Sequence, residues 1–257
     1  MRKLATLLLL SLFSALLSGC GGRSGHPYGI PAQFDDVKPV RWRGNVPSNH
    51  PVHGVDVSRY QGVIDWRQAS ASGVSFAFIK ATEGGEIADP MFWTNWQATA
   101  AAGIPRGAYH FYYFCRTGAE QANWFIQHVP VTPGALPPVL DIEWTNSRSC
   151  PNHPDPATVR AQALDFLNIV GATYGQVPII YTSVDFWQDN ELWRISGFPF
   201  WLRSVAAHPR DVYDGHHWTF WQYTGTGLAP GFRGQVDLNA FAGSQNDWQN
   251  WLATHRL

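Results

Sequence analysis

Charge is scarce in this chain of 257 residues. Only 14% of the residues are Asp, Glu, Lys or Arg, the formal net charge is −1, and the sequence contains no basic run. Proteins that bind nucleic acids need clustered basic residues to neutralise phosphates, so we exclude nucleic acid as a partner. No internal repeat or second domain is visible, and the length suits one large α/β domain.

Cysteine is also rare, with three residues in the chain. Cys115 and Cys150 are too few to hold a metal ion without other ligands, and the pair His216-His217 has no further ligand cluster beside it. We therefore predict neither a metal site nor a cofactor.

The N-terminus has the pattern of a secretion signal. Two basic residues precede an uncharged apolar run over residues 4–17, which is shorter than the roughly 20 residues of a membrane-spanning helix. The run ends in Leu17-Ser18-Gly19-Cys20, which resembles a bacterial lipobox. The resemblance implies a lipoprotein signal peptide over residues 1–19 and acylation of Cys20. An ordinary cleavable signal and an uncleaved anchor are the alternatives.

A lipid on Cys20 would attach the protein to a membrane. Gly21 stands where aspartate favours retention in the inner membrane, so we expect the outer membrane, facing the periplasm, in a Gram-negative cell. Residues 20–50 contain glycines, prolines and polar residues without a clear period, and we expect a flexible tether there. Residues 51–257 are expected to form one folded domain and a monomer.

Export would also affect the two remaining cysteines. In an oxidising compartment Cys115 and Cys150 are expected to form a disulfide. The bond would close a loop of the chain, which stabilises the fold by roughly 3–4 kcal/mol in the chain-entropy model.

From His53 onward, apolar strands alternate with helical segments. Glycines and prolines mark most of the helix ends, and Asp155 and Ser244 are candidate N-caps. Eight strands are predicted over residues 54–58, 76–81, 106–114, 137–144, 177–182, 200–203, 219–223 and 236–239. A helix is expected after each of the first five strands and after the last. This order predicts an α/β fold with a parallel sheet, an irregular TIM-like barrel of five β/α units followed by three strands.

The fourth strand carries two acids, in Pro137-Pro138-Val139-Leu140-Asp141-Ile142-Glu143-Trp144. Side chains alternate along a strand, so Asp141 and Glu143 face the same side, roughly 6.5–7 Å apart. Two carboxylates this close repel each other, and one of them should hold its proton more tightly. A protonated acid beside an ionised one is the equipment for cleaving a glycosidic bond. The alternative is an exposed strand end with two solvated acids.

In such barrels the active site lies at the carboxyl ends of the strands. Five carboxylates and several aromatic residues are predicted there, which is costly without a functional reason. The acids are Asp56, Glu83, Asp141, Glu143 and Asp237.

Six motifs in order resemble family 25 of the glycoside hydrolases, the bacterial and fungal N-acetylmuramidase lysozymes. They are Gly54-Val55-Asp56-Val57-Ser58-Arg59-Tyr60-Gln61-Gly62, Phe78-Ile79-Lys80-Ala81-Thr82-Glu83-Gly84, Gly107-Ala108-Tyr109-His110-Phe111, Val139-Leu140-Asp141-Ile142-Glu143, Trp221-Gln222-Tyr223 and Val236-Asp237-Leu238-Asn239. The resemblance implies a catalytic barrel over residues 51–257 that hydrolyses the β-1,4 bond between N-acetylmuramic acid and N-acetylglucosamine in peptidoglycan.

The resemblance also implies roles for individual residues. Glu143 is expected to be the general acid, and Asp141 to assist the 2-acetamido group of the substrate or the positive charge that develops on the sugar. Asp56 and Asp237 match two further acids of the family's pocket. The candidate sugar contacts are Tyr109, Tyr181, Trp221 and Gln222.

Several alternatives stay open. The barrel could bind peptidoglycan without cleaving it, or act on another N-acetylated glycan, and the stereochemical outcome could be retention or inversion. Lys80 is expected to pair with an acid, Glu83 to anchor a loop, and His110 to be a core histidine or a pocket wall. Arg203 stands where many relatives carry a small residue, which leaves the sugar subsites in doubt.

Overall fold

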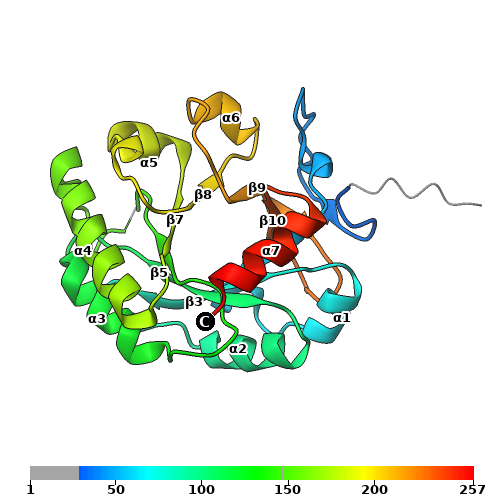
Figure 1. Ribbon diagram of the computed structural model, residues 1–257, viewed down its shortest axis with the longest axis horizontal. Helices are drawn as coiled ribbons and strands as arrows, with labels where there is room; N and C mark the ends of the chain where they lie inside the picture. Colours follow the sequence, from blue (N-terminus) through cyan, green and yellow to red (C-terminus); the bar gives the residue numbers. More distant parts are fainter. Residues whose placement is uncertain (1–28, 146) are drawn as a thin grey trace, which may run out of the picture.

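The computed structural model describes residues 29–145 and 147–257 (Figure 1). The predicted signal peptide, Cys20 and the first part of the predicted tether lie outside the described residues. Eight strands form the barrel: β2 (His53–Val57), β3 (Ala77–Glu83), β5 (Arg106–Phe111), β6 (Val139–Asp141), β7 (Ile179–Thr182), β8 (Phe200–Arg203), β9 (Phe220–Leu228) and β10 (Val236–Phe241). The predicted eight-stranded α/β barrel is confirmed.

One strand runs against the others. Strands β2, β3, β5, β6, β7, β8 and β9 are parallel neighbours in that order. Strand β10 pairs antiparallel with both β9 and β2 and so closes the barrel. The prediction of a parallel sheet was therefore wrong for the last strand. No helix lies between β9 and β10, and a short connection returns the chain in the opposite direction.

Helices follow each of the first five barrel strands and lie around the barrel (Figure 1). They are α1 (Trp66–Ala71), α2 (Phe92–Ala101), α3 (Gly118–His128), α4 (Pro156–Tyr174) and α5 (Val184–Asp189). Helix α4 begins as predicted, because Asp155 accepts hydrogen bonds from the backbone N–H groups of Ala157 and Thr158. The short elements are α6 (Pro209–Val212), the 3-10 turns η1 (Pro47–Asn49), η2 (Arg59–Gln61) and η3 (Leu192–Arg194), and the strands β1 (Asp35–Asp36) and β4 (Ile87–Ala88).

The interior of the barrel is aromatic and is closed at one end by α7 (Gln245–His255). Figure 1 shows this helix lying across the barrel. Its Trp248 packs on Phe76 and Phe241, with ring centroids 5.4 and 5.2 Å apart. Because Phe76 directly precedes β3, α7 covers the end of the barrel where the parallel strands begin. The opposite end, where the parallel strands finish, is not covered by this helix, and the predicted site lies there.

Residues 29–50 are not the flexible tether that we expected. Strand β1 pairs antiparallel with β9, and Trp42 packs edge-on against Trp221 with ring centroids 5.2 Å apart. Ile30 and Phe34 also pack against the core. The physical reason is that β9 and β10 have no helix of their own on their outer face. The apolar residues of this segment cover that face instead.

The predicted disulfide is present. Cys115 and Cys150 are bonded, with their Cα atoms 5.6 Å apart. They lie in the loops that follow β5 and β6, so the bond joins the loops on either side of the acid strand. Among the described helices, none is both long and apolar enough to span a membrane.

The packing of Trp42 gives a direct test of the corrected segment. Replacing Trp42 by Ala removes a partly buried aromatic side chain and uncovers Trp221. We expect a loss of about 2 kcal/mol in the free energy of unfolding, measured by urea denaturation. The exposed neighbour Arg43 supplies the control, since Arg43→Ala should change the stability little. Equal stabilities of the two variants would show that Trp42 does not stabilise the fold, and would favour the flexible tether that we expected.

Candidate active site

Asp56 is held by two amide side chains at the open end of the barrel. Its Oδ2 accepts hydrogen bonds from Asn239 Nδ2 at 2.7 Å and from Gln222 Nε2 at 3.0 Å. The amide oxygens are engaged as well, because Tyr181 Oη donates to Gln222 Oε1 at 2.9 Å and Trp201 Nε1 donates to Asn239 Oδ1 at 2.8 Å. These partners orient both amides so that their N–H groups face the carboxylate.

This network opposes the effect of burial on Asp56. Burial raises the pKa of Asp56 to about 6, while the hydrogen bonds from Asn239 and Gln222 lower it. Two N–H donors stabilise the ionised form. Asp56 is thus the member of the acid group that is best supported as an anion at neutral pH.

Asp141 and Glu143 emerge on the same side of the chain, as the alternation predicts. Leu140 and Ile142 lie in the core outside the barrel strands. Asp141 is the last residue of β6, and the N–H of Ile142 donates to the carbonyl oxygen of Tyr181 at 3.0 Å. This bond continues the strand pairing beyond β6 and directs Glu143 to the barrel mouth.

Both carboxyl groups hold protons more tightly than usual. Burial, followed by the proximity of Glu143, raises the pKa of Asp141 well above its ordinary value. Burial raises the pKa of Glu143 to about 7, although Arg203 lowers it. Asp141 Oδ1 is buried and has no hydrogen-bond partner among the described residues. The pair can therefore supply a proton near neutral pH.

Asp237 joins the other acids from the antiparallel strand β10. It pairs in register with Asp56, because β10 begins at the end of the barrel where the parallel strands finish. We had placed Asp237 at the carboxyl end of a parallel strand; its position at the mouth is the same, but it lies at the start of an antiparallel one. Burial and then Asp56 raise the pKa of Asp237 to about 8.

The structure brings most of the other predicted residues to the same place. Tyr109 and Tyr181 are buried inside the barrel, and the acids near each of them contribute to raising its pKa, after the larger effect of burial. Gln222 faces Asp56. Trp221 was predicted wrongly as a sugar contact: it is fully buried, and its Nε1 donates to Ser204 O at 2.8 Å. It points away from Gln222 because neighbours on a strand face opposite sides.

Three polar residues near the mouth have structural partners. Lys80 Nζ lies 2.6 Å from Glu83 Oε2, and Tyr113 also donates a hydrogen bond to Glu83. His110 is fully buried, with Thr82 Oγ1 2.8 Å from its Nδ1 and Gln121 Oε1 3.0 Å from its Nε2. The predicted pairing of Lys80 is confirmed, Glu83 is held between two partners, and His110 is a satisfied core histidine.

Sequence reasoning missed the residues that support the acids. Asn239 and Trp201 were not among the predicted site residues, and neither was Asp185, whose charge helps to raise the pKa of Glu143. The inward-facing positions of β8 and β10 could have indicated Trp201 and Asn239. No pattern in the sequence indicates Asp185, because it reaches Glu143 from the helix after the neighbouring strand.

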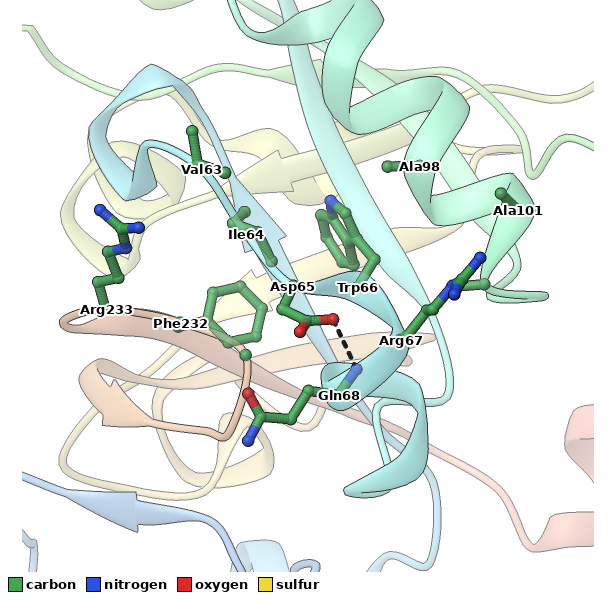
Figure 2. A pocket seen from close by; sticks show the side chains of 12 residues that line it. Val63, Ile64, Asp65, Trp66, Arg67, Gln68, Ala98, Ala101, Phe232 and Arg233 are labelled. Carbon is green, nitrogen blue, oxygen red and sulfur yellow. Dashed lines mark hydrogen bonds between the residues drawn. The ribbon is translucent and has the colours of Figure 1, made fainter.

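A separate cleft of about 610 Å³ lies between α1, the end of α2 and the loop from β9 to β10. Figure 2 shows Arg67 and Arg233 on either side of it. Its one acid, Asp65, is occupied by capping α1, since Oδ1 accepts the N–H of Gln68 at 3.0 Å. In residues 29–145 and 147–257, no group of three or more His, Cys, Asp or Glu side chains is placed to hold a metal ion.

The comparisons with known proteins agree with this geometry. Residues 55–232 match the family model described as glycosyl hydrolases family 25. The chain belongs to glycosyl hydrolase family 25. It is 35% identical over 225 residues to the Escherichia coli (strain K12) protein YegX, covering 85% of this chain and 80% of YegX. It is 36% identical over 201 residues to Lysozyme M1 of Streptomyces globisporus, covering 75% and 68% of the two chains.

The fold of this family 25 enzyme is similar to that of a solved relative. A family 25 glycosyl hydrolase from Bacillus anthracis matches with a TM-score of 0.74 and 32% identity, covering 83% of this chain and 99% of that one. The protein is therefore a glycoside hydrolase, and its acid-lined barrel mouth is the candidate active site.

The raised pKa of Asp237 predicts how stability depends on pH. The folded state binds a proton that the unfolded chain, with a pKa of 3.8 for aspartate, has released. The contribution of Asp237 to stability should therefore be largest below about pH 4 and be lost as the pH rises toward about 8. Asp237→Asn removes this dependence, so it should gain stability over the wild type at pH 8 and not at pH 4.

Urea denaturation at a series of pH values measures this difference. The control is Asp214→Asn, in an exposed turn at a φ of 51° that asparagine tolerates, which should leave the slope unchanged. A constant difference between Asp237→Asn and the wild type across this pH range would contradict the prediction.

Proposed function

We propose that this glycoside hydrolase cleaves the β-1,4 bond between N-acetylmuramic acid and N-acetylglucosamine in peptidoglycan, with Glu143 as the general acid. The observation that carries the proposal is the group of buried and partly buried acids at the mouth of the barrel, where Asp237 lies opposite Asp56 and burial raises the pKa of Glu143 to about 7. A carboxyl group that keeps its proton near neutral pH can protonate the leaving oxygen of a glycosidic bond. The similarity to Lysozyme M1 supports the lysozyme-type substrate.

Asp141 is proposed to orient the 2-acetamido group of the substrate or to stabilise the charge that develops on the sugar. Its raised pKa suits a carboxyl group that makes a hydrogen bond to a polar substituent of the sugar. Asp56 and Asp237 are proposed to bind sugar hydroxyls and to keep Glu143 protonated. Tyr109, Tyr181 and Gln222 line the floor beneath them.

The protonation states favour substrate-assisted retention over inversion. An inverting enzyme needs a second carboxylate as a base for water. Asp237 has a pKa of about 8 and so keeps its proton at neutral pH, and the Asp56 carboxylate already accepts hydrogen bonds from two amide donors. Neither is well suited as a free base, whereas the acetamido oxygen of the substrate can act as the nucleophile. NMR of the first-formed product anomer distinguishes the two routes.

The central test is the variant Glu143→Gln, which removes the proton donor and keeps the shape. We expect the release of reducing ends from purified sacculi to fall by at least 10²-fold, consistent with the loss of general acid catalysis. In the wild type the rate should fall as the pH rises above about 7, because Glu143 then loses its proton. The matched control is Glu120→Gln, since glutamine also serves in the capping box of α3.

The same assay separates the alternatives. If Glu143→Gln releases reducing ends as fast as the wild type, Glu143 is not the general acid. Wild-type protein that binds sacculi and releases no reducing ends would be a non-catalytic barrel. Faster turnover of chitin oligomers than of sacculi would indicate another N-acetylated glycan, and mass spectrometry of the new reducing sugar identifies the bond.

We also propose that the protein is exported and anchored in the membrane through acylated Cys20. The supporting observation is the lipobox-like sequence Leu17-Ser18-Gly19-Cys20. Cys20→Ser should abolish the incorporation of labelled fatty acid into the protein in growing cells. The control Ser18→Ala, which keeps a small residue before the cysteine, should still be labelled. Equal labelling of Cys20→Ser and wild type would rule out this anchor.

A further inference from the structure

We propose that Arg203 is a specificity-determining residue that binds the free lactyl carboxylate of N-acetylmuramic acid in glycan strands from which the stem peptide has been removed. This inference rests on the proposed function and goes beyond it, because it selects one form of the wall polymer. It is carried by the position of the Arg203 side chain and by what surrounds it.

Arg203 lies on the inner wall of the barrel at its open end. It is the last residue of β8. Two positions before it, Trp201 packs inside the barrel against Tyr181, with ring centroids 4.5 Å apart, while Leu202 lies in the outer core. Alternation therefore directs the Arg203 side chain inward. It is in register with Gln222 on β9, beside the residues that hold Asp56.

The Arg203 backbone is fixed and its side chain is partly exposed. Tyr213 Oη donates a hydrogen bond to the carbonyl oxygen of Arg203 at 2.6 Å. None of the ion pairs closer than 4 Å among the described residues includes Arg203. Lys80 differs, because it is occupied by Glu83. Arg203 is thus a cation on the inner wall of the mouth that no carboxylate of the described residues holds within 4 Å.

The neighbouring acids feel the charge of Arg203, which lowers the pKa of Asp56, Glu143 and Asp237, but none of them forms an ion pair with it within 4 Å. Burial raises the pKa of Glu143 to about 7 and that of Asp237 to about 8, and holds that of Asp141 above its ordinary range. Asp237 and Asp141 therefore favour their protonated forms near neutral pH, Glu143 is only partly ionised there, and Asp56 already has two amide donors. An anionic ligand can therefore approach the guanidinium without facing four negative charges.

The chemistry of the substrate suggests which anion this is. In a β-1,4-linked strand of N-acetylated sugars, the ring substituent that can carry charge is the lactyl ether of muramic acid. It is a carboxylate when the peptide has been removed and a neutral amide when the peptide is attached. A guanidinium binds a carboxylate through two parallel hydrogen bonds and gains much less from an amide. The preferred strands are then products of an amidase-type reaction.

Binding measurements on a non-cleaving background test the proposal. Isothermal titration calorimetry would compare Glu143→Gln with Glu143→Gln/Arg203→Met, using peptide-free glycan strands whose lactyl groups are either free carboxylates or methylamides. The Glu143→Gln protein should bind the carboxylate form about 10- to 100-fold more tightly than the amide form. Adding Arg203→Met should abolish that difference, and Arg203→Lys should keep part of it. Glu143→Gln/Arg233→Met, which changes an exposed arginine beside the cleft of Figure 2, should keep all of it.

Kinetics on the active enzyme provide a second readout. Arg203→Met should raise KM for carboxylate strands and leave KM for amide strands unchanged. The fall of kcat with pH should move to higher pH in both cases, because Arg203 no longer lowers the pKa of Glu143. Equal weakening of both strand forms, or unchanged affinity for carboxylate strands, would overturn the proposal, since Arg203 would then act on the fold or on the acids. Full activity of Glu143→Gln would defeat the proposed role of Glu143 alone, because the KM comparison between the wild type and Arg203→Met does not use that variant and would still report on Arg203.

Discussion

The antiparallel pairing of β10 with β2 is the constraint on which the active site depends. It closes the barrel and sets Asp237 opposite Asp56, although the two residues are far apart in the sequence. The same pairing brings Asn239 within 2.7 Å of the Asp56 carboxylate. An open sheet with the same strands would leave the two edges apart and would divide the acids between them. The candidate active site therefore needs the complete barrel.

The site is built at the expense of stability. Several carboxyl groups are buried at one end of the barrel, where desolvation favours their neutral forms. The aromatic column beneath them makes this arrangement tolerable. Trp201 stacks on Phe78 with ring centroids 4.7 Å apart, and it also donates the hydrogen bond that orients Asn239. One side chain thus belongs both to the packed interior and to the polar site.

The sequence was sufficient to predict features that follow from local periodicity. The eight strands, the helix caps at Asp155 and Ser244, and the shared face of Asp141 and Glu143 all follow from patterns within a few residues. Features set by distant partners were out of reach. Trp221 was predicted as a sugar contact from the family resemblance; alternation with Gln222 places the two side chains on opposite faces, but only the structure shows that Trp42 covers Trp221. The lack of a helix before β10 was predicted, but the antiparallel direction of β10 is set by its pairing with β9 and β2.

Helix α7 has a consequence for the order of assembly. The aromatic residues inside the barrel stay open to water until β10 has paired and Trp248 has covered the lower opening. Both events involve segments that leave the ribosome after all the other strands. Until then, a nascent chain exposes the apolar surface of an incomplete barrel. Such a chain is suited to being held unfolded by a chaperone until its last elements are available.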